Sequence, residues 1–277
     1  MNKPILSNQQ HRFIAFDLDG TLLNSKKEVL PASLAALRQL QEDGVKVILA
    51  SGRHPMGIAP VAEVLDLRSF GGYMLCFNGG KVVRCSDHKT VVTYPLPRDL
   101  AVRAARIAKE FGLCPVTYSE TALITEEPDN PYALSEANMN HLAVEKVDNI
   151  EDYIQSDVNK LLVVGPSEMI SAKWKLYQEA VGSEYEISCS SPYFIEVMPG
   201  GMDKAESLRR LLATEGFSPE NLVAFGDGGN DRSMIMLANI GLAMENAIPD
   251  VKAIADRVIG NCETDAIARA IQEIWYS

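Results

Sequence analysis

The segment Phe13-Ile-Ala-Phe-Asp17-Leu-Asp-Gly-Thr21 decides the fold class of this 277-residue chain. It is a short apolar run that stops abruptly at two carboxylates and a glycine. Such a run is typical of a buried parallel strand with a loop at its carboxyl end, and Gly20 permits a tight turn there. The segment therefore predicts a strand of an α/β sheet whose edge carries acidic groups.

Alternating strands and helices are predicted on both sides of a long middle stretch. The first block has strands at 13–17, 45–50 and 73–76 and helices at 31–42 and 55–65. The last block, after Gly200-Gly201, has helices at 204–214, 233–237, 248–255 and 265–275 and strands at 222–225 and 240–243. The middle has a hairpin over 81–94, helices at 98–111, 129–138 and 168–181, and strands at 114–118, 122–125, 160–164, 184–189 and 193–197.

Two blocks of one architecture separated by a different one indicate a core domain with an insert. Alternating strands and helices favour a doubly wound, Rossmann-like parallel sheet, whereas the middle is a mixed α+β pattern. We expect the core to comprise residues 1–82 and 198–277, and the insert, residues 83–197, to form an α+β cap domain.

Composition excludes several classes of protein. The net charge of −11 and the pI near 4.9 leave no basic surface for nucleic acid or an anionic membrane. The five cysteines lack a C-x-x-C pair and are expected to be reduced thiols. Residues 1–12 do not resemble a signal peptide, and no run approaches the about 18 apolar residues of a membrane helix. We expect a cytoplasmic monomer or homodimer.

Carboxylates follow two of the predicted strands. Asp17 and Asp19 follow the first, and Asp227 and Asp231 follow the strand at 222–225. Ligands of open α/β sheets bind beyond the carboxyl ends of the strands. Unit charges about 4 Å apart would repel by about 4 kcal/mol at an effective dielectric of 20. Mg²⁺, which prefers oxygen ligands, would relieve this repulsion, so the sequence predicts a magnesium site.

Four segments, in order, resemble the motifs of the haloacid dehalogenase (HAD) superfamily. They are Asp17-Leu-Asp-Gly-Thr21, Ala50-Ser-Gly-Arg53, Lys204 and Gly226-Asp-Gly-Gly-Asn-Asp231. The insert and the turn at Asn78-Gly-Gly80 are similar to those of the Cof-type branch, which has a large α/β cap. The resemblance covers essentially the whole chain. It implies a magnesium-dependent phosphatase that acts on a small phosphorylated metabolite.

The resemblance also implies a role for each motif residue. Asp17 would be the nucleophile that forms an aspartyl-phosphate. Asp19 would be the general acid toward the leaving oxygen and then the general base for water. Ser51 would donate a hydrogen bond to the phosphoryl oxygens, and Lys204 would neutralise charge on Asp17 and the transferring group.

The metal and substrate ligands are implied in the same way. The Asp17 carboxylate, the Asp19 backbone carbonyl and the Asp227 carboxylate would hold Mg²⁺, with Asp231 close by. The residues expected to bind substrate are Gly52, Arg53, Asn78, Gly79 and Asn230.

Two segments depart from the branch pattern. The branch often has Ser or Asn before the lysine and Gly after it, whereas this chain has Asp203 and Ala205. A local ion pair between Asp203 and Lys204 would alter the geometry of the lysine. The segment Asn261-Cys-Glu-Thr-Asp265 replaces a commoner Asp-Gly pattern. Together with Ser51-Gly-Arg-His54, it is similar to bacterial pyridoxal phosphate phosphatases, which makes pyridoxal phosphate one expected substrate.

Other readings of the chain stay open at this point. A phosphotransferase or phosphomutase would use the same aspartyl-phosphate, and a receiver-like signalling module would keep it. Arg53 could bind a substrate anion or cap a helix, and His54 could be a base or an ordinary loop residue. Three aromatic residues of the insert could stack on a substrate ring or pack in its core: Tyr118, Tyr132 and Trp174.

Overall fold

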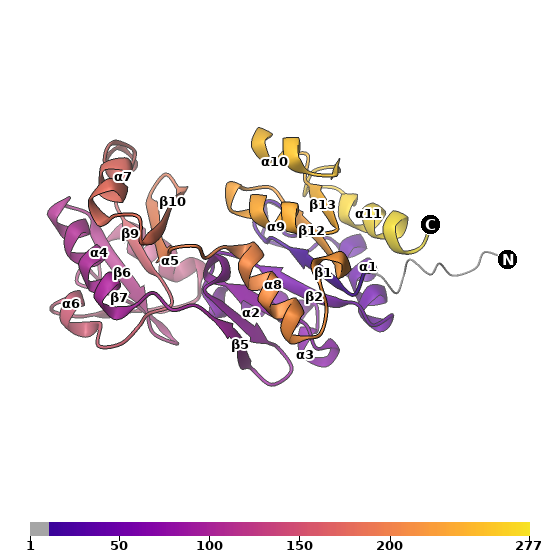
Figure 1. The fold of residues 1–277 in the computed structure, drawn as a ribbon, viewed down its shortest axis with the longest axis horizontal. Helices are drawn as coiled ribbons and strands as arrows, with labels where there is room; N and C mark the ends of the chain where they lie inside the picture. The colour runs from indigo at the N-terminus through magenta and orange to yellow at the C-terminus, as the bar shows by residue number, and fades with distance from the viewer. Residues whose placement is uncertain (1–10) are drawn as a thin grey trace. The chain divides into compact units, whose positions relative to one another are not determined.

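The computed structural model describes residues 11–277, which divide into two compact units (Figure 1). Unit 1 comprises the chain up to Gly52, Ile58–Val92 and Asp203–Ser277. Unit 2 comprises Arg53–Gly57 and Thr93–Met202. The prediction that residues 1–12 form no signal peptide falls largely on residues outside the described part.

Unit 1 is built on an eight-stranded sheet whose order is β14-β13-β12-β1-β2-β3-β4-β5. Its strands are β1 (Phe13–Phe16), β2 (Lys46–Ala50), β3 (Tyr73–Cys76), β4 (Lys81–Arg84), β5 (Lys89–Thr93), β12 (Leu222–Gly226), β13 (Ile240–Ala243) and β14 (Arg257–Val258). The apolar strand β1 is fully buried and pairs in parallel with β2 and β12. The acidic segment after β1 therefore leaves the middle of the sheet.

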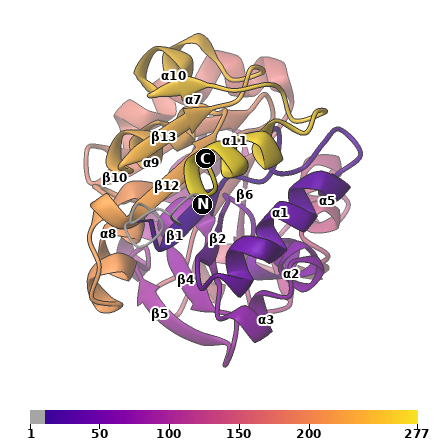
Figure 2. The same ribbon diagram turned by 90° about the vertical axis from the view of Figure 1, so that its right-hand side faces the viewer.

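Helices lie on both sides of this sheet in Figure 2, with α1 and α11 on one side and α8 and α9 on the other. The helices of unit 1 are α1 (Pro31–Glu42), α2 (Pro55–Val64), α3 (Leu67–Phe70), α8 (Lys204–Thr214), α9 (Arg232–Leu237), α10 (Pro249–Ile254) and α11 (Ala266–Trp275), although the first turn of α2 belongs to unit 2. Helix α1 begins at Pro31, which suits a first helical turn, and packs against α11.

The hairpin β4–β5 belongs to unit 1, although the sequence prediction placed residues 83–92 in the insert. Strand β4 pairs antiparallel with β3, with Cys76 opposite Lys81 and Tyr73 opposite Arg84. The hairpin thus joins the sheet of unit 1 through backbone hydrogen bonds, even though the alternation of strands and helices in the sequence stops before it. That the insert serves as a cap stays a prediction.

Unit 2 contains a second, mixed sheet of six strands in the order β10-β11-β9-β6-β7-β8. Its strands are β6 (Cys114–Tyr118), β7 (Ala122–Thr125), β8 (Ala143–Lys146), β9 (Leu161–Val164), β10 (Tyr185–Ser191) and β11 (Phe194–Pro199). Its helices are α4 (Arg98–Glu110), α5 (Pro131–Met139), α6 (Ile150–Tyr153) and α7 (Ser167–Val181). All its neighbouring strands are antiparallel except β7 and β8.

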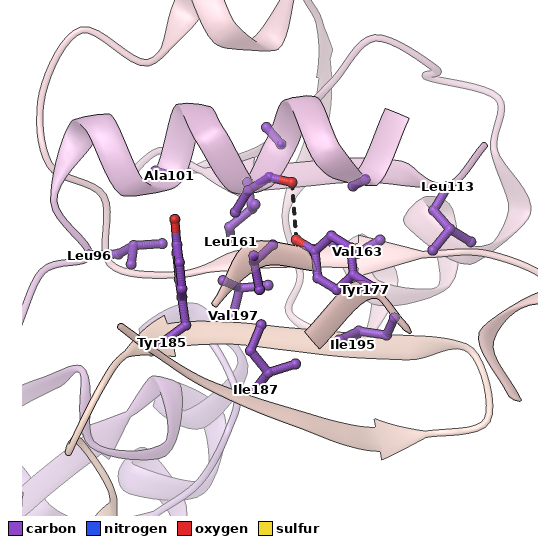
Figure 3. Packing of buried hydrophobic residues seen from close by; sticks show 14 of the residues in the cluster. Leu96, Ala101, Leu113, Leu161, Val163, Tyr177, Tyr185, Ile187, Ile195 and Val197 are labelled. Atoms are coloured by element: carbon purple, nitrogen blue, oxygen red, sulfur yellow. Dashed lines mark hydrogen bonds between the residues drawn. The ribbon is translucent and has the colours of Figure 1, made fainter. Parts of the chain in front are cut away.

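The core of unit 2 lies between helices α4 and α7 and the sheet (Figure 3). Tyr177 of α7 is fully buried there, and its hydroxyl donates a hydrogen bond of 3.0 Å to the carbonyl oxygen of Ala104 in α4. This bond satisfies a polar group that would otherwise be costly to bury. It also fixes the two helices relative to each other.

The predicted fold class is confirmed: a largely parallel α/β core is accompanied by a mixed α+β unit. The short elements α3, α6, β8 and β14 were not predicted, because elements of two to four residues show too little periodicity. No helix within residues 11–277 is long and apolar enough to cross a membrane.

Candidate active site and metal centre

Two neighbouring strands place acidic residues at the same edge of the unit 1 sheet. Asp17 follows β1 directly, and its backbone N–H donates a hydrogen bond of 3.0 Å to the carbonyl oxygen of Phe225 in β12. Asp227 follows the last residue of β12. Because β1 and β12 are parallel and in register, the two carboxylates leave the sheet together, as the sequence predicted.

Lys204 is the positive centre of this cluster. Its side chain is 0% exposed, and its Nζ donates three hydrogen bonds, to Asp17 Oδ1 at 2.7 Å, Asp231 Oδ1 at 2.6 Å and the Ala50 carbonyl oxygen at 2.8 Å. All three donor positions of the ammonium group are therefore used.

Asp203 does not disturb Lys204, contrary to the local ion pair considered above. Its carboxylate is the N-cap of α8 and accepts a hydrogen bond of 2.8 Å from the backbone N–H of Glu206. Capping satisfies one of the free N–H groups at a helix start. The cap therefore sets where α8 begins, with Lys204 as its first residue.

The buried side chain of Asp231 forms hydrogen bonds with the backbone of its own loop, which follows β12. Its Oδ2 accepts hydrogen bonds of 2.9 Å from the backbone N–H groups of both Asp227 and Gly228, and its side chain is 0% exposed. With Oδ1 bound to Lys204, both of its oxygens have partners. Asp231 thus orients the backbone that carries Asp227.

The three carboxylates of Asp17, Asp227 and Asp231 form a group that fits a cation. Each offers an oxygen, and these oxygens lie within 4.8 Å of one another. Thr21 Oγ1 donates a hydrogen bond of 2.6 Å to Asp227 Oδ1. Gly20 has φ +86°, and a Cβ there would lie 2.5 Å from Asp227 Oδ2, so only glycine lets the two loops approach so closely.

Within residues 11–277, the carboxylates of the cluster have one cationic partner. Three carboxylates share one ammonium group, that of Lys204. Burial, reinforced by the charge of Asp231 and opposed by Lys204, raises the pKa of Asp17 to about 8. Burial also raises the pKa of Asp227. Hard oxygen donors with surplus negative charge are what a divalent cation such as Mg²⁺ binds.

The pKa of Lys204 is also shifted. Burial by itself would lower the pKa of this ammonium group, but the Asp17 and Asp231 carboxylates outweigh burial and raise the pKa above its usual value. Lys204 is therefore charged at neutral pH.

Asp19 lies at the exposed side of the same loop. Its side chain is 36% exposed, and its Oδ1 pairs with the Nζ of Lys27 at 2.7 Å. An exposed carboxyl group two residues beyond Asp17 can exchange protons with water, which suits an acid and base. The Lys27 partner was not predicted from the sequence.

Most of the remaining predicted site residues also belong to unit 1. Ser51 follows β2, is 3% exposed, and accepts a hydrogen bond of 3.0 Å at its carbonyl from the backbone N–H of Asn78. Asn230 Nδ2 donates to Asn78 Oδ1 at 2.9 Å, which joins the turn after β3 to the Asp227 loop. A Cβ at Gly52 would lie 3.0 Å from Asn78 Nδ2, and one at Gly79 would meet the carbonyl oxygen of Asp203.

Arg53 and His54, in contrast, belong to unit 2. Arg53 Nη1 donates to the Gly57 carbonyl at 3.1 Å. His54 is 4% exposed and its ring is held on both sides: Nδ1 accepts from the backbone N–H of Met56 at 3.1 Å, so Nε2 donates to the Ser119 carbonyl at 3.1 Å. In this structure His54 anchors its segment.

The three candidate aromatic residues of unit 2 have different environments. Tyr118 is buried, and its hydroxyl donates to Glu136 Oε1 at 2.7 Å. Trp174 is partly buried against the core cluster. Tyr132 stacks on Tyr193, with ring centroids 5.1 Å apart.

Sequence reasoning missed two further residues of the site besides Lys27. Thr21 closes the first motif and its hydroxyl reaches Asp227. Asn246 follows β13, and its Nδ2 donates to the Gly20 carbonyl at 2.7 Å and lies 3.5 Å from Asp227 Oδ2. The sequence indicated Asn246 only by its position. Like Asp227, it follows the carboxyl end of a parallel strand, where ligands bind.

The fold and the acidic site define a class of hydrolase, and comparison with known proteins agrees. A family model described as haloacid dehalogenase-like hydrolase matches residues 14–271, so the chain belongs to this family. Within it, the chain is a phosphatase of the Cof-type branch that acts on small phosphomonoesters.

Similar proteins resemble the chain over nearly its whole length. The chain is 30% identical to pyridoxal phosphate phosphatase YbhA of Escherichia coli (strain K12), over 94% of this chain and 97% of that protein. It is 28% identical to the HMP-PP phosphatase of Serratia proteamaculans, over 95% and 94% of the two chains. A solved haloacid dehalogenase-like hydrolase from Bacteroides thetaiotaomicron is 35% identical, with a TM-score of 0.88 over 95% of this chain and 99% of the other.

Proposed function

We propose that the chain hydrolyses phosphate monoesters through an aspartyl-phosphate on Asp17. The observation that carries this proposal is the contact of Lys204 Nζ with both Asp17 and Asp231, beside the Asp227 carboxylate. Lys204 Nζ binds Asp17 Oδ1, and we assign the other carboxylate oxygen of Asp17 as the one that attacks phosphorus. The arrangement is that of a nucleophile oriented by a fixed cation.

The reaction has two steps. In the first, an Asp17 oxygen bonds to phosphorus, the bond from phosphorus to the leaving oxygen breaks, and Asp19 gives that oxygen a proton. In the second, Asp19 takes a proton from water, the water oxygen bonds to phosphorus, and the bond to Asp17 breaks. Inorganic phosphate leaves, and both carboxyl groups return to their starting states.

The protein groups around the transferring phosphoryl group bind and neutralise it. Lys204 would balance the charge of Asp17 and, through its electric field, that of the equatorial oxygens. We assign Ser51 as a hydrogen-bond donor to those oxygens, since it is the first residue after β2. The proposed substrate contacts are Gly52, Arg53, Asn78, Gly79 and Asn230.

Mg²⁺ is the proposed cofactor. The Asp17 and Asp227 carboxylates and the Asp19 backbone carbonyl would hold it, while Asp231, whose oxygens bind Lys204 and two backbone N–H groups, would position them. When bound, the ion offsets the surplus negative charge of the cluster and of the phosphoryl group.

We propose pyridoxal phosphate as the leading substrate and unit 2 as the cap that selects it. Support comes from the 30% identity to the E. coli pyridoxal phosphate phosphatase and from the segments at 51–54 and 261–265 noted above. The 28% identity to the HMP-PP phosphatase makes HMP-PP the main competing substrate.

A screen of phosphate release tests the substrate and the reaction class together. Purified protein with Mg²⁺ and no added acceptor is given pyridoxal phosphate, sugar phosphates, nucleotides and flavin mononucleotide. Hydrolysis predicts free phosphate with kcat/KM highest for pyridoxal phosphate. Consumption of the substrate that requires an added alcohol, with the phosphoryl group recovered on that alcohol and no free phosphate, would instead favour the phosphotransferase.

Substitution of the nucleophile tests the mechanism. Asp17→Asn should lower kcat at least about 10³-fold, because an amide cannot form the phosphoenzyme, while circular dichroism shows a folded protein. The control is Asp99→Asn in unit 2, where the carboxylate is 89% exposed and turnover should not change. Substantial activity of Asp17→Asn would refute the assignment of the nucleophile.

A further inference from the structure

The loop 261–264, between β14 and α11, contacts the segment that follows the first motif. Glu263 Oε1 accepts a hydrogen bond of 2.7 Å from the backbone N–H of Ser25. This is the same loop whose sequence departs from the Cof-type pattern. The mechanism proposed above gives it no role, although the bond joins residues 238 positions apart.

Ser25 lies at the tip of a tight hairpin that begins at Asp19. Leu23 bridges both Asp19 and Val29, and Asn24 Oδ1 accepts from the backbone N–H groups of residues 26 and 28 at 3.0 Å each. The turn brings Lys27 back onto Asp19, where Nζ and Oδ1 are 2.7 Å apart. The orientation of the Asp19 side chain therefore depends on where this hairpin is held.

A second contact holds the other end of the hairpin to the same loop. Asn246 Nδ2 donates to the Gly20 carbonyl at 2.7 Å, and Asn246 Oδ1 accepts from the backbone N–H of Cys262 at 3.2 Å. Gly20 is the residue directly after Asp19. The C-terminal loop thus fastens the hairpin at its base through Asn246 and at its tip through Glu263.

We propose that Glu263, together with Asn246, is a positioning residue that orients Asp19 for proton transfer to the leaving oxygen. The inference rests on the proposed acid role of Asp19. Glu263 and Ser25 are both exposed, so their bond contributes little to burying a core. Its evident effect is to restrict the hairpin, and a proton donor on a loop needs such support to keep a productive geometry.

The test compares two classes of substrate. The value of kcat/KM reports the steps up to departure of the leaving group. An alkoxide needs a proton from Asp19 to leave, whereas nitrophenolate leaves without one. For Glu263→Ala we expect kcat/KM to fall about tenfold for an alkyl phosphate and by less than about twofold for p-nitrophenyl phosphate.

Two matched variants separate positioning from a general loss of structure. Glu263→Gln keeps an oxygen that can accept the Ser25 N–H and should restore both values to within about twofold of wild type. Glu273→Ala removes a carboxylate that is 61% exposed on α11 and should leave the ratio of the two values unchanged. The urea midpoints of all three variants should match that of the wild type.

The outcomes distinguish this inference from the proposed function. Asp19→Asn sets the largest leaving-group effect that loss of the acid can produce. If Asp19→Asn shows this effect but Glu263→Ala does not, or if Glu263→Ala slows both substrates equally, the positioning role is overturned. If Asp19→Asn itself shows no leaving-group effect, the acid role of Asp19 fails, and the inference fails with it.

Discussion

Lys204 is the residue on which the charge balance of the site depends. The sequence predicted a lysine near the nucleophile, and the structure supplies its three partners: Asp17, Asp231 and the Ala50 carbonyl. An ammonium group can be buried completely only when such partners replace its water. The contacts on which the proposed catalytic role of Lys204 rests therefore also stabilise the fold.

Loss of the Lys204 ammonium group should lower the free energy of unfolding. In Lys204→Met, Asp17 and Asp231 are left buried without a cation, and removing one partner of a buried ion pair costs about 3–5 kcal/mol. Urea unfolding in the presence of EDTA measures the difference. Lys27→Met, which breaks an exposed pair, should cost less than about 1 kcal/mol. Equal losses in the two variants would contradict the buried role.

The raised pKa of Asp17 predicts how metal binding varies with pH. In the metal-free protein the pKa is about 8, against an ordinary value of 3.8, so folding favours the protonated form. The resulting stabilisation is complete below about pH 4 and is lost as the pH rises through 8. Because the proposed Mg²⁺ would bind the ionised carboxylate, the rise in Tm that it causes should be larger at pH 8 than at pH 6.

Thermal unfolding at both pH values, with Mg²⁺ or with EDTA, measures this effect. Asp17→Asn is the control, since its amide does not titrate and the difference between the two pH values should shrink. A Mg²⁺ effect in the wild type that is the same at both pH values, or larger at pH 6, would show that Asp17 does not limit metal binding.

At the scale of elements, three neighbouring strands and one helix of unit 1 each place a residue at the candidate site. Strands β1, β2 and β12 end directly before Asp17, Ser51 and Asp227, and helix α8 begins with Lys204. These positions could be predicted, because apolar runs that stop at polar residues mark strand ends. The role of Asp203 as the N-cap of α8 could not be predicted. From the sequence alone, its carboxylate could equally have paired with Lys204.

Removal of the N-cap of α8 should affect both stability and catalysis. Asp203→Ala leaves a backbone N–H at the helix start without its partner and should cost about 1 kcal/mol. Because Lys204 is the first residue of that helix, kcat should also fall, by about two- to fivefold. Asp203→Ser keeps a capping oxygen and should retain most of both properties. An unchanged urea midpoint in Asp203→Ala would contradict the capping role.

At the scale of the whole molecule, the insert forms a unit with its own core. All six strands of its sheet and all four of its helices come from the stretch Thr93–Met202, as does the cluster of Figure 3. Only Arg53–Gly57 joins unit 2 from elsewhere in the chain. A unit with its own hydrophobic core can in principle fold alone, and here one continuous stretch supplies that core.

A fragment of residues 93–202 should therefore fold without the rest of the chain. We expect one cooperative urea transition and a near-ultraviolet circular dichroism signal from packed aromatic rings. In the fragment, Tyr177→Ala should lower the free energy of unfolding by about 3–5 kcal/mol, because it leaves a cavity in the core. A fragment that binds the dye ANS and lacks the aromatic signal would contradict the prediction.

The sequence by itself determined the order of the longer strands and helices and the acidic groups at the strand ends. Both follow from local physics, because periodicity, proline and glycine act within a few residues. Only the tertiary structure decided that the β4–β5 hairpin extends the core sheet, that His54 is buried in unit 2 and that Glu263 reaches Ser25. These contacts join residues that are distant in the chain. Each polar group has many possible partners in the sequence, and the packing of whole elements decides which of them it contacts.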